Sequence, residues 1–221
     1  NINGNAGVVE IFSRTGLDKI EYRGIESIKT ISDKEATALI KIYHPDFAQE
    51  MAVSLTLNKD DAGNWRIVRI NNFQDFVKNV SNIRYVQLNN YLDQSAEIIS
   101  RHDTIIREAE QKYASIMATG TVGQEEIYSD LRTLMIDIVQ KDWEARKQEL
   151  LNLSVPPEAT TLQNMRLKIC DLEIGYAQDY VQWMDDKKEL TITSAEDKKA
   201  QARALSAEST ELARNLAEQV G

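Results

Sequence analysis

Residues 88 to 116 read LNNYLDQSAEIISRHDTIIREAEQKYASI, and this stretch decides the fold of the second half of the chain. Nine positions along it follow one another in alternating steps of four and three. They are Leu88, Leu92, Ser95, Ile99, His102, Ile106, Ala109, Tyr113 and Ile116. Such spacing places all of these residues on one side of a helix. The sequence therefore predicts one long helix with a packing seam, over residues 81–118.

Further helical segments are expected in the same half of the chain. The second helix is expected over residues 124–153. Its expected inward residues are Ile127, Leu131, Leu134, Ile138, Ala145 and Leu150. The prolines at 156–157 stand where a third helix would begin, a position at which a missing N–H costs nothing. Thr193 with Glu196 is a capping-box pattern for a fourth helix. Short connections make successive helices antiparallel, so an up-down four-helix bundle is the simplest arrangement.

The first part of the chain has a different period. After a short helical pattern at 8–17, stretches rich in β-branched and aromatic residues alternate with turn residues. The expected strands are residues 25–31, 36–43, 51–57 and 65–70. The sequence therefore predicts an α+β fold with two domains. Residues 1–79 form a small antiparallel sheet with a short helix, and residues 80–221 form the antiparallel helical bundle.

Charge is unevenly distributed along the chain. The chain has 26 basic and 35 acidic residues, which gives a formal net charge of −9. Residues 1–80 hold 10 basic and 11 acidic residues, so the remainder holds 16 and 24. An acidic surface repels phosphate backbones, and no basic stripe interleaved with aromatic residues offsets it. We therefore expect no nucleic-acid partner.

Cysteine content and hydropathy exclude other classes. Cys170 is the single cysteine, which excludes an intrachain disulfide, and its apolar neighbours predict a buried structural thiol. No stretch approaches the ~20 apolar residues of a membrane span, so direct membrane insertion is not expected. The first residue is Asn1 rather than methionine, which leaves open a removed N-terminal signal or membrane anchor.

Residue types that carry catalysis are scarce. The two histidines are His44 and His102. His44 precedes a proline and is interpreted as a turn residue. Three positions before His102 stands Ile99, whereas a di-metal bundle motif needs glutamate there. Phosphate-loop, dinucleotide and nucleophile-elbow motifs are missing from the sequence. We therefore expect no catalytic residues, no metal and no cofactor, and a chain that is not an enzyme.

His102 has a second interpretation because it lies on the seam of the long helix. At that position we expect a hydrogen-bonded histidine in the core or between helices. A buried imidazole resists protonation, because burial disfavours the charged form. His102 is therefore also a candidate for a pH-sensitive packing element.

Residues 63–73 read GNWRIVRINNF and close the expected hairpin. Together with the helical pattern at 8–17 and the strands at 36–43 and 51–57, they resemble the last half of a nuclear-transport-factor-like or cystatin-like α+β domain. Such domains occur in uncharacterised bacterial exported proteins. The resemblance covers residues 8–80 and departs from the full pattern because the longer N-terminal helices are missing. It implies a fold and carries almost no information about function.

Two classes of function remain as expectations. The first is a bacterial scaffold or protein-interaction module, exported or membrane-tethered, which binds a protein partner or a second copy of itself. Its expected location is periplasmic or at the cell surface, although a cytoplasmic location stays open. The alternative is a binding module in which the concave face of the sheet holds a small apolar ligand. The residues expected to line that pocket are Val53, Leu55, Trp65 and Ile67.

Overall fold

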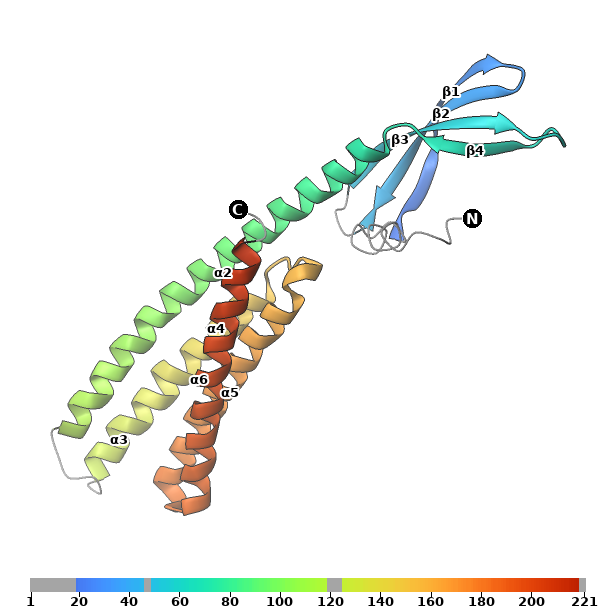
Figure 1. Ribbon diagram of the computed structural model, residues 1–221. Coiled ribbons are helices and arrows are strands. Elements are labelled where there is room, and N and C mark those ends of the chain that lie inside the picture. Colours follow the sequence, from blue (N-terminus) through green and yellow to red (C-terminus); the bar gives the residue numbers. More distant parts are fainter. Residues whose placement is uncertain (1–18, 46–48, 119–124, 219–221) are drawn as a thin grey trace. The chain divides into compact units, whose positions relative to one another are not determined.

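The computed structural model describes residues 19–45, 49–118 and 125–218 (Figure 1). The chain divides into two compact units, Asn1–Val86 and Gln87–Gly221. An antiparallel sheet is followed by long helices, which confirms the predicted α+β fold with a helical bundle. The helix expected over residues 8–17 lies outside the described residues.

The described part of the first unit contains a four-stranded antiparallel sheet with strand order β1-β2-β3-β4. The strands are β1 Glu21–Ser32, β2 Glu35–His44, β3 Gln49–Lys59 and β4 Trp65–Ile70. Each covers the range predicted for it. The turn between β3 and β4 is held by Asp60, whose carboxylate accepts hydrogen bonds from the backbone N–H groups of Ala62 and Asn64 at 3.1 and 2.9 Å. Gly63 adopts a φ of +83° in this turn, which glycine tolerates best.

One face of the sheet packs against the beginning of helix α2, Phe73–Ala118. The buried residues of this small core are Ile42, Val53, Leu55, Phe76 and Val80. His44 stands two residues after Ile42 and is fully buried at the end of β2. Alternate residues of a strand point to the same face, so His44 continues the covered face. The prediction that His44 is a turn residue is therefore wrong.

The described residues of the second unit form a bundle of four helical segments. The first is the part of α2 that follows residue 86. The second is one continuous run made of α3 Glu125–Leu134, the π-helix η3 Met135–Gln140 and α4 Lys141–Leu151. A short 3-10 turn, η4 Pro157–Ala159, leads into α5 Thr160–Asp186, and α6 Glu189–Glu218 completes the bundle.

The seam predicted along α2 is confirmed. Leu88, Ser95, His102 and Ala109 are buried. The five seam residues between and after them are half-buried. This helix therefore turns the predicted side toward the interior of the bundle.

The π-helix η3 changes which residues of the second segment face inward. A π-turn holds about one more residue than an α-turn, so the inward side after η3 is shifted by one residue relative to an unbroken α-helix. Val139, Trp143 and Arg146 are buried, whereas Ala145 is exposed. The prediction that Ala145 faces inward is wrong for this reason, and a guanidinium group takes its place.

The start of α6 also differs from the prediction. Its first residue is Glu189, so Thr193 and Glu196 lie inside the helix and are not its cap. The Asp186 carboxylate at the end of α5 accepts hydrogen bonds from the Lys188 backbone N–H and the Thr191 hydroxyl, both at 2.9 Å. This carboxylate satisfies the first polar groups of α6 and fixes its early start.

Cys170 is fully buried on α5, in the core of the bundle. Burial raises the pKa of its thiol to about 11, because desolvation disfavours the thiolate. At neutral pH the side chain is therefore a protonated thiol that packs as a small apolar group, as the sequence predicts.

Candidate functional site in the interior of the bundle

The interior of the bundle contains a group of polar and charged side chains in place of a purely apolar core. The buried ones are Ser95, His102, Asp142, Arg146, Gln163, Arg166, Glu173 and Ser209. Charged side chains are almost never buried without partners, because desolvation penalises the ionised form. This polar interior is therefore the strongest candidate for a functional site in the part of the chain that the structure describes.

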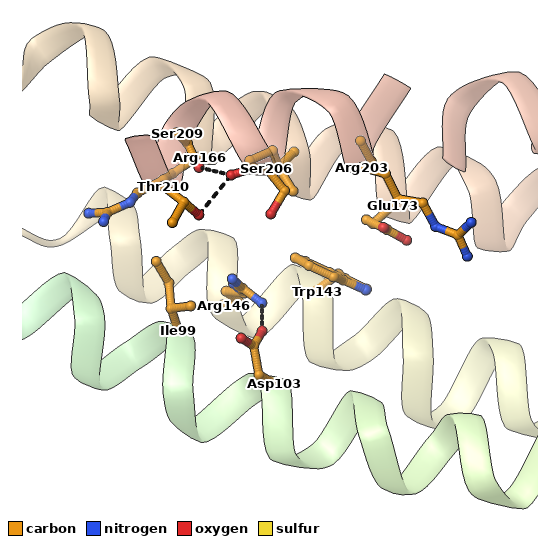
Figure 2. A pocket seen from close by; sticks show the side chains of 12 residues that line it. Ile99, Asp103, Trp143, Arg146, Arg166, Glu173, Arg203, Ser206, Ser209 and Thr210 are labelled. Carbon is orange, nitrogen blue, oxygen red and sulfur yellow. Dashed lines mark hydrogen bonds and ion pairs between the residues drawn. The ribbon is translucent and has the colours of Figure 1, made fainter. Parts of the chain in front are cut away.

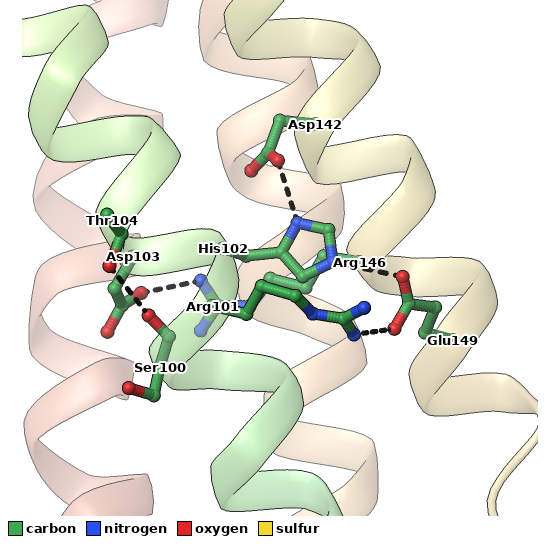
Figure 3. A network of polar contacts seen from close by, with 8 residues as sticks. All are labelled: Ser100, Arg101, His102, Asp103, Thr104, Asp142, Arg146 and Glu149. Atoms are coloured by element: carbon green, nitrogen blue, oxygen red, sulfur yellow. Dashed lines mark hydrogen bonds and ion pairs between the residues drawn. The ribbon is translucent and has the colours of Figure 1, made fainter.

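A polar network around His102 joins α2 to α4 (Figure 3). His102 Nδ1 lies 2.7 Å from an Asp142 oxygen, and Nε2 lies 3.3 Å from a Glu149 oxygen. Arg101 pairs with the same glutamate. A carboxylate only accepts hydrogen bonds, so both contacts can be hydrogen bonds only when both ring nitrogens carry a proton. His102 is thus a buried, hydrogen-bonded histidine between helices, and its pH-sensitive role stays a prediction.

Arg146 links the same two helices through a second ion pair. Its Nη1 donates to the Asp103 carboxylate at 2.8 Å. Its guanidinium group also lies over the ring of Trp143, 4.4 Å from the ring centroid, which is a cation–π distance. Arg146 is buried and Asp103 is half exposed, so the pair holds the arginine where the interior meets the surface.

Arg166 of α5 has a different environment. It is 7% exposed, and its Nη1 donates to the Tyr91 hydroxyl at 3.3 Å and to Ser95 Oγ at 2.5 Å. Both partners are neutral, and no carboxylate among the described residues forms an ion pair with Arg166. Burial lowers the pKa of Arg166, because desolvation disfavours the charged guanidinium. Arg166 is therefore a buried cation without a counter-charge in the described structure.

The neighbours of Arg166 are fixed by further hydrogen bonds. The Tyr91 hydroxyl donates to Gln163 Oε1 at 3.0 Å, and Gln163 Nε2 donates to the backbone carbonyl of Leu150 at 2.6 Å. Ser95 Oγ donates to the backbone carbonyl of Tyr91 at 2.6 Å. Both hydroxyl protons are thus engaged elsewhere, so the hydroxyl oxygens can only accept from Arg166. This arrangement orients the guanidinium group without neutralising it.

A cavity of about 220 Å³ lies beside these arginines (Figure 2). Its walls come from α2, α4, α5 and α6, and Figure 2 shows Trp143 and Arg146 in the space between α2 and α6. The lining residues are Ile99, Asp103, Trp143, Arg146, Arg166, Ile169, Glu173, Ala202, Arg203, Ser206, Ser209 and Thr210.

Three donor atoms on residues of the cavity wall have no hydrogen-bond partner among the described residues. They are Trp143 Nε1, Arg146 Nε and Arg166 Nε, and all three side chains are more than nine-tenths buried. These groups can donate but cannot accept. A buried donor without a partner costs roughly 1–3 kcal/mol. The unpaired buried atoms of these three wall residues are therefore all N–H donors, which only an acceptor group could satisfy.

The charges of the cavity wall leave a positive excess. Lys199 Nζ donates to the Glu173 carboxylate at 2.8 Å, and Asp103 is paired with Arg146. The two remaining cations of the wall are Arg166 and Arg203, for which the described residues supply no ion pair. The acidity of the whole chain therefore does not extend into this cavity.

The structure separates the four residues of the ligand pocket predicted on the sheet. Val53 and Leu55 are buried against the beginning of α2, whereas Trp65 and Ile67 are exposed. Strand register pairs Ile67 with Leu57 and Trp65 with Lys59. Paired residues share a face, so all four side chains lie on the same face of the sheet, with the exposed two beyond the covered region. Ligand binding by these residues stays a prediction.

The spacing of residues along α5 predicts that Arg166 faces inward. A search for apolar residues alone does not find it. Leu162, Arg166, Ile169 and Glu173 follow one another in steps of four, three and four, and all are buried. The pattern that identified α2 therefore also applies to α5 when charged residues are allowed at inward positions. The same spacing holds for Val139, Trp143, Arg146 and Leu150, which are all buried, but it is out of step with the residues before the π-helix η3.

Over residues 19–45, 49–118 and 125–218, no group of three or more histidine, cysteine, aspartate or glutamate side chains could hold a metal ion. None of the helices in these ranges is both long and apolar enough to cross a membrane. No protein-family model, curated protein or solved structure matches the chain, so no family is assigned.

Proposed function

We propose that the helical bundle is a non-catalytic module that binds a small anionic molecule in the cavity beside Arg166. The observation that carries the proposal is the burial of this guanidinium group against neutral partners, on the wall of a cavity. A buried ion without a counter-charge is strongly unfavourable. A carboxylate or phosphate group would supply that counter-charge and would accept from the planar fork of the guanidinium.

The charge of the rest of the chain supports a small ligand over a polyanion. A formal net charge of −9 repels a nucleic acid that must approach a large surface. Such repulsion between exposed charges is screened beyond roughly 8–10 Å at physiological salt, whereas a buried arginine acts at contact distance. An anion small enough to enter the cavity is therefore attracted locally in spite of the acidic surface.

Titration with small anions, followed by NMR of the tryptophan indole N–H groups, tests the proposal. Trp143 lines the cavity, whereas Trp65 is exposed on the sheet and Trp183 packs beside Tyr128 and Tyr180. We expect acetate, benzoate or phosphate to shift the Trp143 signal in a saturable way, because an acceptor enters the cavity. The signals of Trp65 and Trp183 serve as internal controls, and Trp143→Phe assigns the reporting signal. A Trp143 signal that none of these anions moves would contradict the proposal.

Self-association through the sheet is a second candidate function, favoured by exposed apolar residues on both outer strands. Tyr22, Ile25 and Ile28 of β1 pair with Ile42, Ile40 and Ala38 of β2, so they share the face that α2 covers in the middle. On β4, the same face carries Trp65, Ile67 and Ile70. All six side chains are exposed. Exposed apolar groups gathered on one face are typical of interaction sites, and a second copy of the chain is the occupant that needs no charge complementarity.

Sedimentation analysis tests this second candidate. We expect the chain to form a dimer at micromolar concentrations, and Ile28→Lys or Ile67→Lys to convert it to a monomer. Each substitution places a charge in the proposed contact, and desolvating that charge opposes association. Leu190→Lys is a matched control, because Leu190 is exposed at the start of α6, outside the sheet. A chain that is monomeric at all concentrations would exclude self-association.

A further inference from the structure

A second cavity, of about 190 Å³, adjoins the cavity beside Arg166. Trp143 and Arg203 belong to the walls of both. The other residues of the second wall are Ile106, Ala109, Glu110, Tyr113, Leu134, Met135, Val139, Tyr176 and Lys199. Together the two cavities fall within the range of about 300–1,000 Å³ that is typical of small-molecule sites.

The two cavities follow one another along the bundle. On α2 the wall passes from Ile99 and Asp103 to Ile106 and Ala109, which lie on successive turns. On α6 it passes in the opposite chain direction, from Thr210 through Arg203 to Lys199. Opposite directions are those of antiparallel neighbours, so the two cavities follow one another along α2 and α6, with Trp143 and Arg203 on the walls of both.

The chemistry of the first cavity differs from that of the second. The first cavity is lined by the cationic side chains of Arg166 and Arg146 and by the indole of Trp143. The lining of the second cavity includes four buried apolar side chains, Ala109, Leu134, Met135 and Val139. Its tyrosine at position 176 stays a neutral hydroxyl, because burial raises the pKa of Tyr176 to about 12. The first cavity therefore suits an acidic group and the second suits an apolar chain.

The π-helix η3 affects the walls of both cavities. Met135 and Val139, which line the second cavity, belong to η3. The register change that η3 introduces turns Trp143 and Arg146 inward. π-helices are rare and occur frequently at functional sites. This local departure from α-helical geometry therefore supplies wall residues to the second cavity and turns wall residues of the first cavity inward.

We infer that the ligand of the bundle is an acidic amphiphile, with its acidic head at Arg166 and an apolar chain that extends over Ala109 and Val139. The inference rests on the proposed anion site, because the head group occupies that site. Burial of the chain favours longer ligands, by about fourfold in affinity for each methylene removed from water.

Calorimetric titration of the full chain with butyrate, octanoate and octanol tests the inference. We expect octanoate to bind at least about tenfold more tightly than butyrate and octanol, because only octanoate has both the charged head and the long chain. Equal affinity for butyrate and octanoate would overturn the amphiphile and leave the anion site in place. Equal affinity for octanol and octanoate would remove the role of the charged head. Failure of all three to bind would overturn the proposed function as well.

The variant Ala109→Leu tests where the apolar chain of the ligand binds. The larger side chain occupies the second cavity, so we expect octanoate to lose its advantage while butyrate binds as before. Ala114→Leu is a matched control, because Ala114 is exposed on the same helix. Val139→Phe fills the same cavity from η3 and replaces Ala109→Leu if that variant does not fold. If a folded variant binds octanoate as before, the apolar chain of the ligand lies elsewhere and the inference is overturned.

Discussion

Replacing Arg166 with methionine is expected to weaken anion binding by at least about tenfold and to leave the bundle as stable as before, or more stable. Methionine keeps the length of the side chain but removes the charge and the donor fork, which account for binding. Stability is not expected to fall because Tyr91 and Ser95 keep their own acceptors, Gln163 and a backbone carbonyl. Replacing a buried charge with an apolar residue of similar size is often stabilising. Calorimetric titration with octanoate and thermal unfolding measure the two effects.

Two further substitutions control for this prediction. Arg166→Lys keeps the charge but lacks the planar fork, so an intermediate loss of affinity is expected. Arg132→Met removes an arginine paired with Asp185 on the surface of the bundle, outside both cavities, so binding should not change. If Arg166→Met strongly destabilises the bundle and the folded fraction still binds octanoate normally, then Arg166 is a structural residue.

Replacing His102 with alanine is expected to lower the free energy of unfolding of the bundle by about 3 kcal/mol. The imidazole is the hydrogen-bond partner of Asp142 at 2.7 Å, and the second oxygen of that buried carboxylate has no partner among the described residues. Removing the ring leaves a buried carboxylate without compensation, and the cavity left behind adds to the loss. Urea unfolding followed by circular dichroism measures the change.

The paired substitution separates this polar effect from simple loss of packing. Replacing both His102 and Asp142 with leucine removes the uncompensated charge, so the double variant should recover most of the lost stability. His102→Gln retains an N–H donor toward Asp142 and is expected to lose less than His102→Ala. A variant His102→Ala within about 0.5 kcal/mol of the unsubstituted chain would show that the network contributes little.

The regular elements could be predicted from local pattern alone. The alternating four-three spacing of α2 and the alternating period of β3 report which side of each element is covered, because one side of each packs against neighbours. Turn chemistry at Asp60 and Gly63 then limits the strands on either side. These signals are local, which is why the strands and the seam of α2 lie where they were predicted.

The departures arise where local backbone geometry overrides the pattern of apolar residues. The π-helix η3 exchanges Ala145 for Arg146 at an inward position, and no residue type in that segment marks such an insertion. The Asp186 carboxylate accepts hydrogen bonds from Lys188 and Thr191 at the start of α6. The helix therefore begins before the capping-box pattern at residues 193–196. Both departures depend on backbone geometry that the order of apolar residues does not encode.

The candidate site was harder to predict than the fold. Sequence patterning directed attention to the apolar face of the sheet, whereas the polar cavity is in the bundle. Arg166 is buried only because α2, α4 and α6 surround α5, so its unusual environment is a property of tertiary packing. The sequence pattern treats a charged residue on a helix as an exposed one, which is correct for most arginines.

The most direct test of the anion site is a crystal structure of the chain with bromine-labelled octanoate, in which anomalous scattering locates the bromine. We expect a carboxylate within hydrogen-bond distance of Arg166 and a bromine atom in the second cavity, near Ala109 and Val139. A structure in which water or protein side chains fill the cavity while the ligand binds elsewhere would contradict it.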